Sequence, residues 1–181
     1  MTDIFSDARL ELILGGARSG KSRLAEARAL NSDRKPVYIA TGSAGDDEMT
    51  ERIQHHQARR GPEWKLMETP VRLADCLLQA SADCRCLVVD CLTLWISNCL
   101  HQQCWPEQRD ALLKAITSVK GRVIFVSNEV GSGVVPLGEL SREFVDVSGF
   151  LHQQLAQVCN TVTLVIAGLP LELKNGNGRH D

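Results

Sequence analysis

Hydrophobic residues along the chain form short continuous runs that are separated by longer amphipathic or polar stretches. Five runs are rich in Val, Ile and Leu, as expected of strands that are buried on both faces of a parallel sheet. These predicted strands are Leu10–Leu14, Val37–Thr41, Cys86–Asp90, Arg122–Ser127 and Val162–Ala167.

Stretches of helical composition lie between these runs, and several begin with proline or acidic residues that favour a first helical turn. The predicted helices are Lys21–Leu30, Asp46–Arg60, Pro70–Ala82, Pro106–Lys120 and Glu139–Gln157. Alternating strands and helices predict right-handed βαβ units in one α/β domain over residues 1–181, with a mostly parallel sheet and helices on both faces. The polar end, residues 173–181, is expected to be a flexible tail.

The segment Gly15–Ser22 reads GGARSGKS, which fits the phosphate-loop pattern GxxxxGK[ST]. Glycines allow backbone N–H groups to point at phosphate oxygens, and the helix that follows adds positive potential. Lys21 is expected to reach the β- and γ-phosphates, and the Ser22 hydroxyl to bind Mg²⁺. The strand before the loop and the helix after it disfavour a chance glycine-rich turn. We therefore predict a three-layer P-loop NTPase domain of RecA-like type, which indicates nucleotide binding without specifying the reaction.

Asp90 ends a predicted strand, and phosphate-loop sites usually have a second acid at the end of a neighbouring strand. We predict that Asp90 holds Mg²⁺ directly or through water. The alternative is an aspartate that only caps the next helix.

Two adjacent histidines lie in the predicted helix Asp46–Arg60. At about 100° per residue, His56 falls on the apolar stripe, whereas His55 falls on the charged face between Arg52 and Arg59. An imidazole can attack phosphorus, and nearby arginines favour its neutral form and stabilise phosphate charge. A structural or solvated histidine is the alternative, and the pattern alone does not bring this helix to the phosphate loop.

Further motifs follow GGARSGKS in order: DDEM at 46–49, RIQHH at 52–56, VDCLT at 89–93, NEVG at 128–131 and REFVD at 142–146. Together they resemble the family of bifunctional adenosylcobinamide kinase/adenosylcobinamide-phosphate guanylyltransferases, over about residues 10–174. The resemblance implies phosphorylation of the aminopropanol hydroxyl of adenosylcobinamide by ATP or GTP. It also implies transfer of GMP from GTP to that phosphate, which gives adenosylcobinamide-GDP and pyrophosphate in adenosylcobalamin biosynthesis.

The resemblance also implies roles for individual residues. The first histidine of the pair, His55, would carry GMP as a covalent intermediate, and Lys21 would act in catalysis. The metal positions are Ser22 and Asp90. The implied nucleotide contacts are Gly15, Gly16, Ala17, Arg18, Ser19, Gly20, Lys21, Ser22, Ala40, Thr41, Gly42, His56, Gln57, Ala58, Arg59, Glu68 and Asp90.

The segment Asn128–Gly131 also follows a predicted strand, at the edge where open α/β sheets bind ligands. A substrate or nucleotide contact there is one interpretation, and a simple turn is the other. Two readings of the whole chain also compete with the bifunctional one. The first is a P-loop small-molecule kinase with no transferase step, and the second is a nucleotide-regulated binding module.

Composition narrows the function class. The chain has 181 residues, with 20 Lys and Arg against 22 Asp and Glu, so its net charge of −2 disfavours a nucleic-acid partner. Its seven cysteines show no zinc-site spacing. No apolar run reaches the roughly 18 residues of a membrane span, and no signal peptide is visible. We expect a cytoplasmic protein with reduced, mostly buried thiols, and the family resemblance implies a homo-oligomer.

Overall fold

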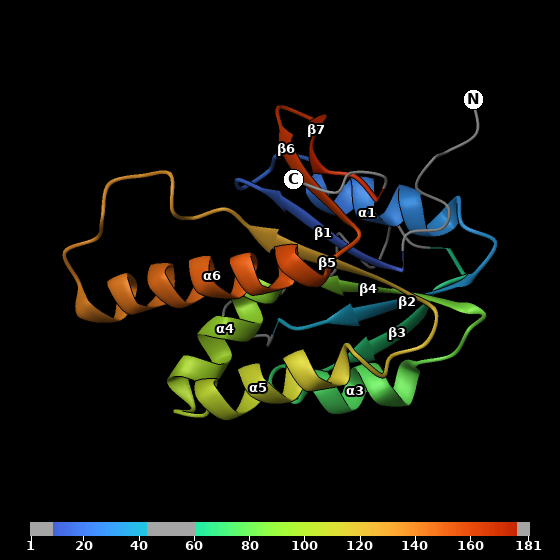
Figure 1. Ribbon diagram of the computed structural model, residues 1–181, viewed down its shortest axis with the longest axis horizontal. Coiled ribbons are helices and arrows are strands. Elements are labelled where there is room, and N and C mark those ends of the chain that lie inside the picture. Colours follow the sequence, from blue (N-terminus) through green and yellow to red (C-terminus); the bar gives the residue numbers. More distant parts are fainter. Residues whose placement is uncertain (1–8, 43–60, 177–181) are drawn as a thin grey trace.

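The computed structural model describes residues 9–42 and 61–176. Within these residues a single sheet of seven strands forms the centre of the molecule, in the order β3-β2-β4-β5-β1-β6-β7 (Figure 1). Six strands run parallel, and β7 pairs antiparallel with β6. The strands are β1 Leu10–Gly15, β2 Lys35–Ala40, β3 Lys65–Glu68, β4 Arg85–Asp90, β5 Arg122–Asn128, β6 Thr161–Ile166 and β7 Leu169–Lys174.

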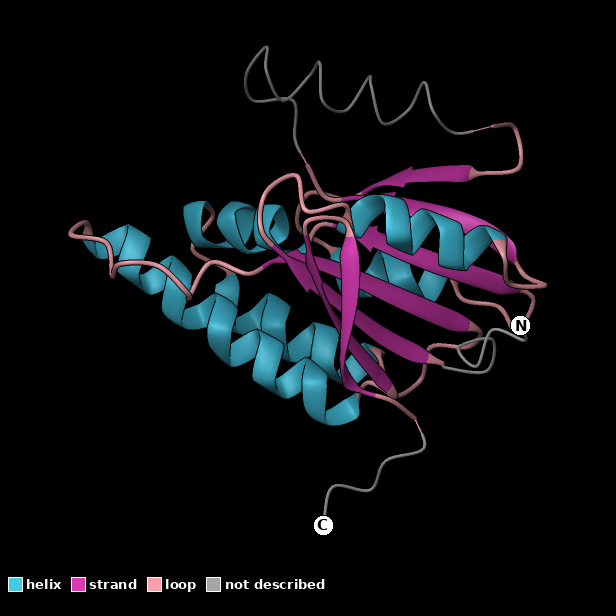
Figure 2. Cartoon of the chain, turned by 90° about the horizontal axis from the view of Figure 1, so that it is seen from above, coloured by secondary structure: helices cyan, strands magenta, loops and turns pink. Residues whose placement is uncertain are grey.

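Helices cover both faces of this sheet, as predicted. The helices are α1 Lys21–Leu30, α3 Leu73–Ala80, α4 Leu92–His101, α5 Trp105–Ala115 and α6 Glu139–Val158. Alternate strand residues point to opposite faces. Leu12, Val89 and Phe125 pack against α3 to α6, whereas Ile13 and Val88 pack against α1. Figures 1 and 2 show α1 on one side of the sheet and the other four described helices on the opposite side.

The five predicted strands are confirmed because the central strands are buried on both faces. In β4, for example, the four residues from Cys86 to Val89 have no exposed surface. Two strands are additional to the prediction. β3 (KLME) and β7 (LPLELK) lie at the two edges of the sheet and are largely exposed, so they lack the continuous apolar pattern of central strands.

Helix boundaries differ from the prediction where side chains take over backbone hydrogen bonds. α3 begins at Leu73 instead of Pro70. The carbonyl oxygens of Pro70 and Val71, which precede it, accept hydrogen bonds from side chains of α4. Trp95 Nε1 donates to Val71 O at 2.6 Å, and Asn98 Nδ2 donates to Pro70 O at 3.0 Å. α4 itself is not in the prediction, since its apolar sequence (LTLWISNCLH) follows β4 without a break signal.

The end of α5 and the start of the predicted tail also differ from the prediction. α5 ends at Ala115, five residues before the predicted end, and the Thr117 hydroxyl donates to Lys114 O at 2.8 Å in the turn that follows. Lys174 belongs to β7 rather than to a flexible tail, and its ammonium donates to Ala156 O at 2.9 Å at the end of α6.

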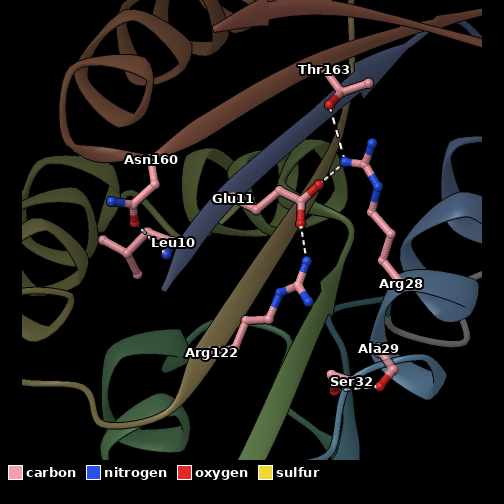
Figure 3. A network of polar contacts seen from close by, with 8 residues as sticks. All are labelled: Leu10, Glu11, Arg28, Ala29, Ser32, Arg122, Asn160 and Thr163. Atoms are coloured by element: carbon pink, nitrogen blue, oxygen red, sulfur yellow. Dashed lines mark hydrogen bonds and ion pairs between the residues drawn. The ribbon is translucent and has the colours of Figure 1, made fainter. Parts of the chain in front are cut away.

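A buried ionic cluster joins α1 to the sheet (Figure 3). Glu11 of β1 is fully buried and pairs with Arg28 of α1 and, at 2.9 Å, with Arg122 of β5. Arg28 also donates to Thr163 Oγ1 at 3.1 Å. Because α1 begins with the last two residues of the GGARSGKS segment, this cluster fixes the far end of the helix that carries them.

Replacing Glu11 with glutamine is expected to destabilise the fold by about 3 kcal/mol, because two buried arginines lose the charge between them. Urea unfolding followed by circular dichroism measures the loss. Glu107→Gln, at an exposed position of α5, is the matched control and should stay within about 0.5 kcal/mol of the parent protein. A Glu11→Gln protein as stable as that control would show that the cluster contributes nothing.

Candidate nucleotide-binding and catalytic site

The phosphate loop lies between the carboxyl end of β1 and the first turn of α1, as predicted. Its first residue, Gly15, leaves no room for a side chain, because a Cβ there would lie 2.6 Å from Val165 O. Gly20 has a φ of 97°, in the left-handed region that glycine adopts without strain. The Gly168 N–H donates to Ser19 O at 2.9 Å, so the β6–β7 turn supports the loop from one side. Contacts within the protein therefore hold the loop in this shape.

Lys21 is buried at the start of α1 and folds back over the loop. Its ammonium donates to Gly16 O at 3.1 Å. Burial lowers the pKa of Lys21, and the nearby Asp90 carboxylate partly offsets that effect by raising it. A desolvated ammonium over a phosphate loop is placed to bind phosphate oxygens.

Asp90 lies at the end of β4, two strands away from the phosphate-loop strand, with β5 between them. The Tyr38 hydroxyl donates to Asp90 Oδ2 at 2.8 Å, which holds the carboxylate in one orientation. The structure therefore brings Lys21 and Asp90 within electrostatic reach, as the sequence predicts. No motif assigns a role to Tyr38, and only the pairing of β2 with β4 reveals it.

The donor set beside the loop fits magnesium chemistry. Ser22 and Asp90 offer oxygen ligands, which Mg²⁺ prefers, and Mg²⁺ usually takes few protein ligands because phosphates and water complete its shell. Within residues 9–42 and 61–176 no group of three or more His, Cys, Asp or Glu side chains forms a metal cage. In the phosphate loop, the Ser19 hydroxyl is buried with no hydrogen-bond partner in the protein, which suits an added phosphate oxygen.

Among the predicted contacts, Ala40 ends β2 beside Asp90, and Thr41 and Gly42 follow it. Ala40 is in register with Asp90, and the buried Thr41 donates from its hydroxyl to Cys91 O at 2.6 Å. Asn98 Nδ2 donates to Thr41 O at 2.9 Å, which ties this turn to α4.

Glu68 ends the edge strand β3 and is exposed. Four inter-strand spacings separate β3 from β1, or roughly 19 Å. The structure therefore does not bring Glu68 to the phosphate loop, and only a ligand lying along the sheet edge could reach both.

The remaining predicted site residues lie outside the described part of the chain. They are the proposed nucleophile His55 and the predicted nucleotide contacts His56, Gln57, Ala58 and Arg59.

The carboxyl end of β5 adds residues to which the sequence assigns no catalytic role. Asn128 is in register with Gly15 and donates from Nδ2 to Thr93 Oγ1 at 3.1 Å. His152 of α6 places Nε2 at 2.8 Å from Ser127 Oγ. Burial lowers the pKa of His152 to about 4, although the Glu129 carboxylate acts to raise it, so the imidazole is neutral at pH 7. No sequence motif marks His152; only the packing of α6 on the sheet shows it.

All seven cysteines lie in the described residues and are free thiols, and five of them are buried, as expected. Burial raises the pKa of Cys91, which follows Asp90, so this thiol stays protonated at neutral pH. No helix in the described ranges is long and apolar enough to cross a membrane.

The loop, the buried lysine and the strand order define a P-loop nucleotide-binding domain. Solved structures agree at the level of fold. The alignment with the flagellar accessory protein FlaH from Methanocaldococcus jannaschii covers 96% of this chain and 82% of that one, with a TM-score of 0.51 and 14% identity. The ATPase EscN of the type III secretion system of enteropathogenic E. coli aligns over 88% of this chain and 43% of its own, with a TM-score of 0.54 and 11% identity.

Sequence comparison identifies the particular family. The model of the cobinamide kinase / cobinamide phosphate guanyltransferase family matches residues 11–173. The bifunctional adenosylcobalamin biosynthesis protein CobP of Pseudomonas aeruginosa is 53% identical, over 91% of this chain and 96% of that protein. CobU of Escherichia coli is 34% identical, over 90% and 98%. The chain belongs to this family, which confirms the predicted family, fold class and enzyme class.

Proposed function

We propose that this chain phosphorylates adenosylcobinamide with ATP or GTP and then transfers GMP from GTP to the adenosylcobinamide phosphate. The family match over residues 11–173 carries the proposal, because it spans the phosphate loop, Asp90 and the residues around His55. The bifunctional names of the bacterial relatives support the same pair of reactions.

In the first reaction the aminopropanol hydroxyl oxygen attacks the γ-phosphorus. The new O–P bond forms as the bond to the β-phosphate oxygen breaks, and the nucleoside diphosphate leaves. Lys21 binds the phosphate oxygens on which charge develops. Mg²⁺ held by Ser22 and Asp90 would neutralise further phosphate charge when bound.

In the second reaction we propose His55 as the nucleophile. A neutral ring nitrogen attacks the α-phosphorus of GTP, an N–P bond forms, and pyrophosphate leaves with the electrons of the broken P–O bond. An oxygen of the corrinoid phosphate then attacks the same phosphorus and releases the histidine. One nucleotide position is proposed for both reactions, in which Ala40–Gly42 contact the nucleotide beyond its phosphates. Glu68 takes part only if the nucleotide extends along the sheet edge from the phosphate loop toward β3.

The remaining features of the proposal concern assembly and location. We propose a homo-oligomer in the cytoplasm, by analogy with the family and from the cysteine content. With a net charge of −2, the phosphates it binds are those of nucleotides and the corrinoid, not of nucleic acid.

The test is to incubate the purified protein with cobinamide, GTP and Mg²⁺ and to follow the corrinoid products by mass spectrometry. Cobinamide phosphate should appear first and cobinamide-GDP should follow with pyrophosphate. If cobinamide phosphate accumulates without GDP product, the chain is a kinase alone. GTP binding with neither product would identify a binding module.

A further inference from the structure

A pocket of about 430 Å³ is lined by residues of α4, of α6 and of the loop that follows β5. Figure 1 shows where these three elements lie in the fold. No lysine, arginine or acid is among its described lining residues. Apolar side chains dominate the wall, and its polar side chains are the hydroxyls of two serines and one imidazole; the lining includes Leu100, Val130, Leu140, Phe144, Ser97, Ser141 and His101. Such a pocket suits a neutral ligand with a few hydrogen-bonding groups and is unsuited to a nucleotide triphosphate.

The pocket is joined to the phosphate loop by two consecutive residues. Val130 lines the pocket, and Glu129 precedes it directly. The Glu129 N–H donates to Gly15 O at 3.1 Å, so the backbone of Glu129 is fixed to the first residue of the loop. The chain thus runs from the loop that would hold the nucleotide into the wall of the pocket.

The Glu129 carboxylate is held in place as an anion. The Gly131 N–H donates to Glu129 Oε1 at 2.7 Å. Burial raises the pKa of Glu129, but hydrogen bonds from Ser132 and Gly131 outweigh that effect and lower it overall. Within the described residues no lysine or arginine forms an ion pair with it. A carboxylate has about four acceptor positions, so one stays open for a hydroxyl group.

We propose that this pocket receives the alcohol arm of the kinase acceptor and that Glu129 accepts the proton of the attacking hydroxyl. The inference rests on the proposed kinase function and adds the acceptor site to it. As the alcohol oxygen bonds to the γ-phosphorus and the diphosphate leaves, the hydroxyl proton passes to the Glu129 carboxylate. Because the transition state is loose, the proton moves late, so a carboxylate of low basicity still serves by orienting the hydroxyl.

The two reactions of the family separate this role from a structural one. In guanylyl transfer the acceptor is a phosphate oxygen, which has no proton to lose at about pH 8. Glu129→Gln should therefore lower the kcat of cobinamide phosphorylation by about 10²–10³-fold, and should lower guanylyl transfer to supplied cobinamide phosphate far less. The KM for the nucleotide should not change.

Two further variants sharpen the experiment. Glu129→Asp keeps the carboxylate, so its kcat for cobinamide phosphorylation should be at least tenfold higher than that of Glu129→Gln. Glu143→Gln removes an exposed acid of α6 that does not line the pocket, and its kinetics should match the parent protein. Thermal melting of each variant checks the fold.

The pocket is tested separately by filling it. Ser141→Trp should raise the KM for cobinamide at least tenfold without changing the KM for GTP. Ser118→Trp, at an exposed position after α5, is the control. If Ser141→Trp changes the oligomeric mass and leaves the cobinamide KM unaltered, a second copy of the chain occupies the pocket and the proposal is wrong.

Failure of this inference differs from failure of the proposed function. A parent protein that does not phosphorylate cobinamide overturns both. An active parent protein with an equally active Glu129→Gln variant overturns the acceptor site alone. A Glu129→Gln variant that instead loses nucleotide affinity at unchanged kcat would make Glu129 a support of the phosphate loop.

Discussion

Replacing Lys21 with alanine is expected to lower the kcat of cobinamide phosphorylation by about 10²–10³-fold, since one preorganised donor to the transition-state charge is lost. The ammonium is buried against the loop, and its pKa is lowered by that burial, so keeping the charge there costs stability. The variant should therefore be at least as stable as the parent protein while being far less active. Steady-state kinetics and thermal melting measure the two effects.

Lys114→Ala is the matched control, because Lys114 is an exposed lysine in the last turn of α5, away from the sheet edge that carries the loop. It should keep the parent kinetics. If Lys21→Ala retained full kinase activity, as Lys114→Ala should, the phosphate would be bound elsewhere and the loop assignment would be wrong. Loss of activity together with loss of fold would point to a structural role instead.

The central sheet could be predicted because its strands are buried on both faces, which requires continuous apolar runs such as Cys86–Asp90. The edge strands could not. In β7, leucines at 169, 171 and 173 alternate with Pro170, Glu172 and Lys174, and both faces of the strand stay largely exposed. α4 escaped prediction for the opposite reason, because its apolar residues follow β4 after only Asp90 and Cys91, with no glycine or proline between the two elements.

The site shows the same division. The phosphate loop is local in sequence, so its motif alone locates Lys21 and Ser22. The contacts that orient the site join distant segments: Tyr38 with Asp90, Asn128 with Thr93, and Gly168 with Ser19. These depend on the strand order, which no single segment encodes. The strand order also shows that Glu68 and the phosphate loop both lie at the carboxyl ends of the strands but four strands apart.

His55 carries the second large expected effect. Incubation with GTP labelled in the α-phosphate should leave GMP on the protein, because attack by imidazole at the α-phosphorus forms an N–P bond. The adduct should be labile in acid and stable in base, as expected of a phosphoramidate. His55→Ala should abolish the label and the formation of cobinamide-GDP, and should still phosphorylate cobinamide, because the kinase step needs no covalent intermediate.

The controls decide which nitrogen carries GMP. His180→Ala changes the last histidine of the sequence and should label like the parent protein. Peptide mapping of the parent adduct should place GMP on His55, whereas a lysine adduct on Lys21 would have similar acid lability. Equal labelling of the parent and His55→Ala proteins would refute the assignment. A label that survives in His55→Ala but is lost in His56→Ala would move the nucleophile to the neighbouring residue, and the helical phase that separates the two faces would then be incorrect.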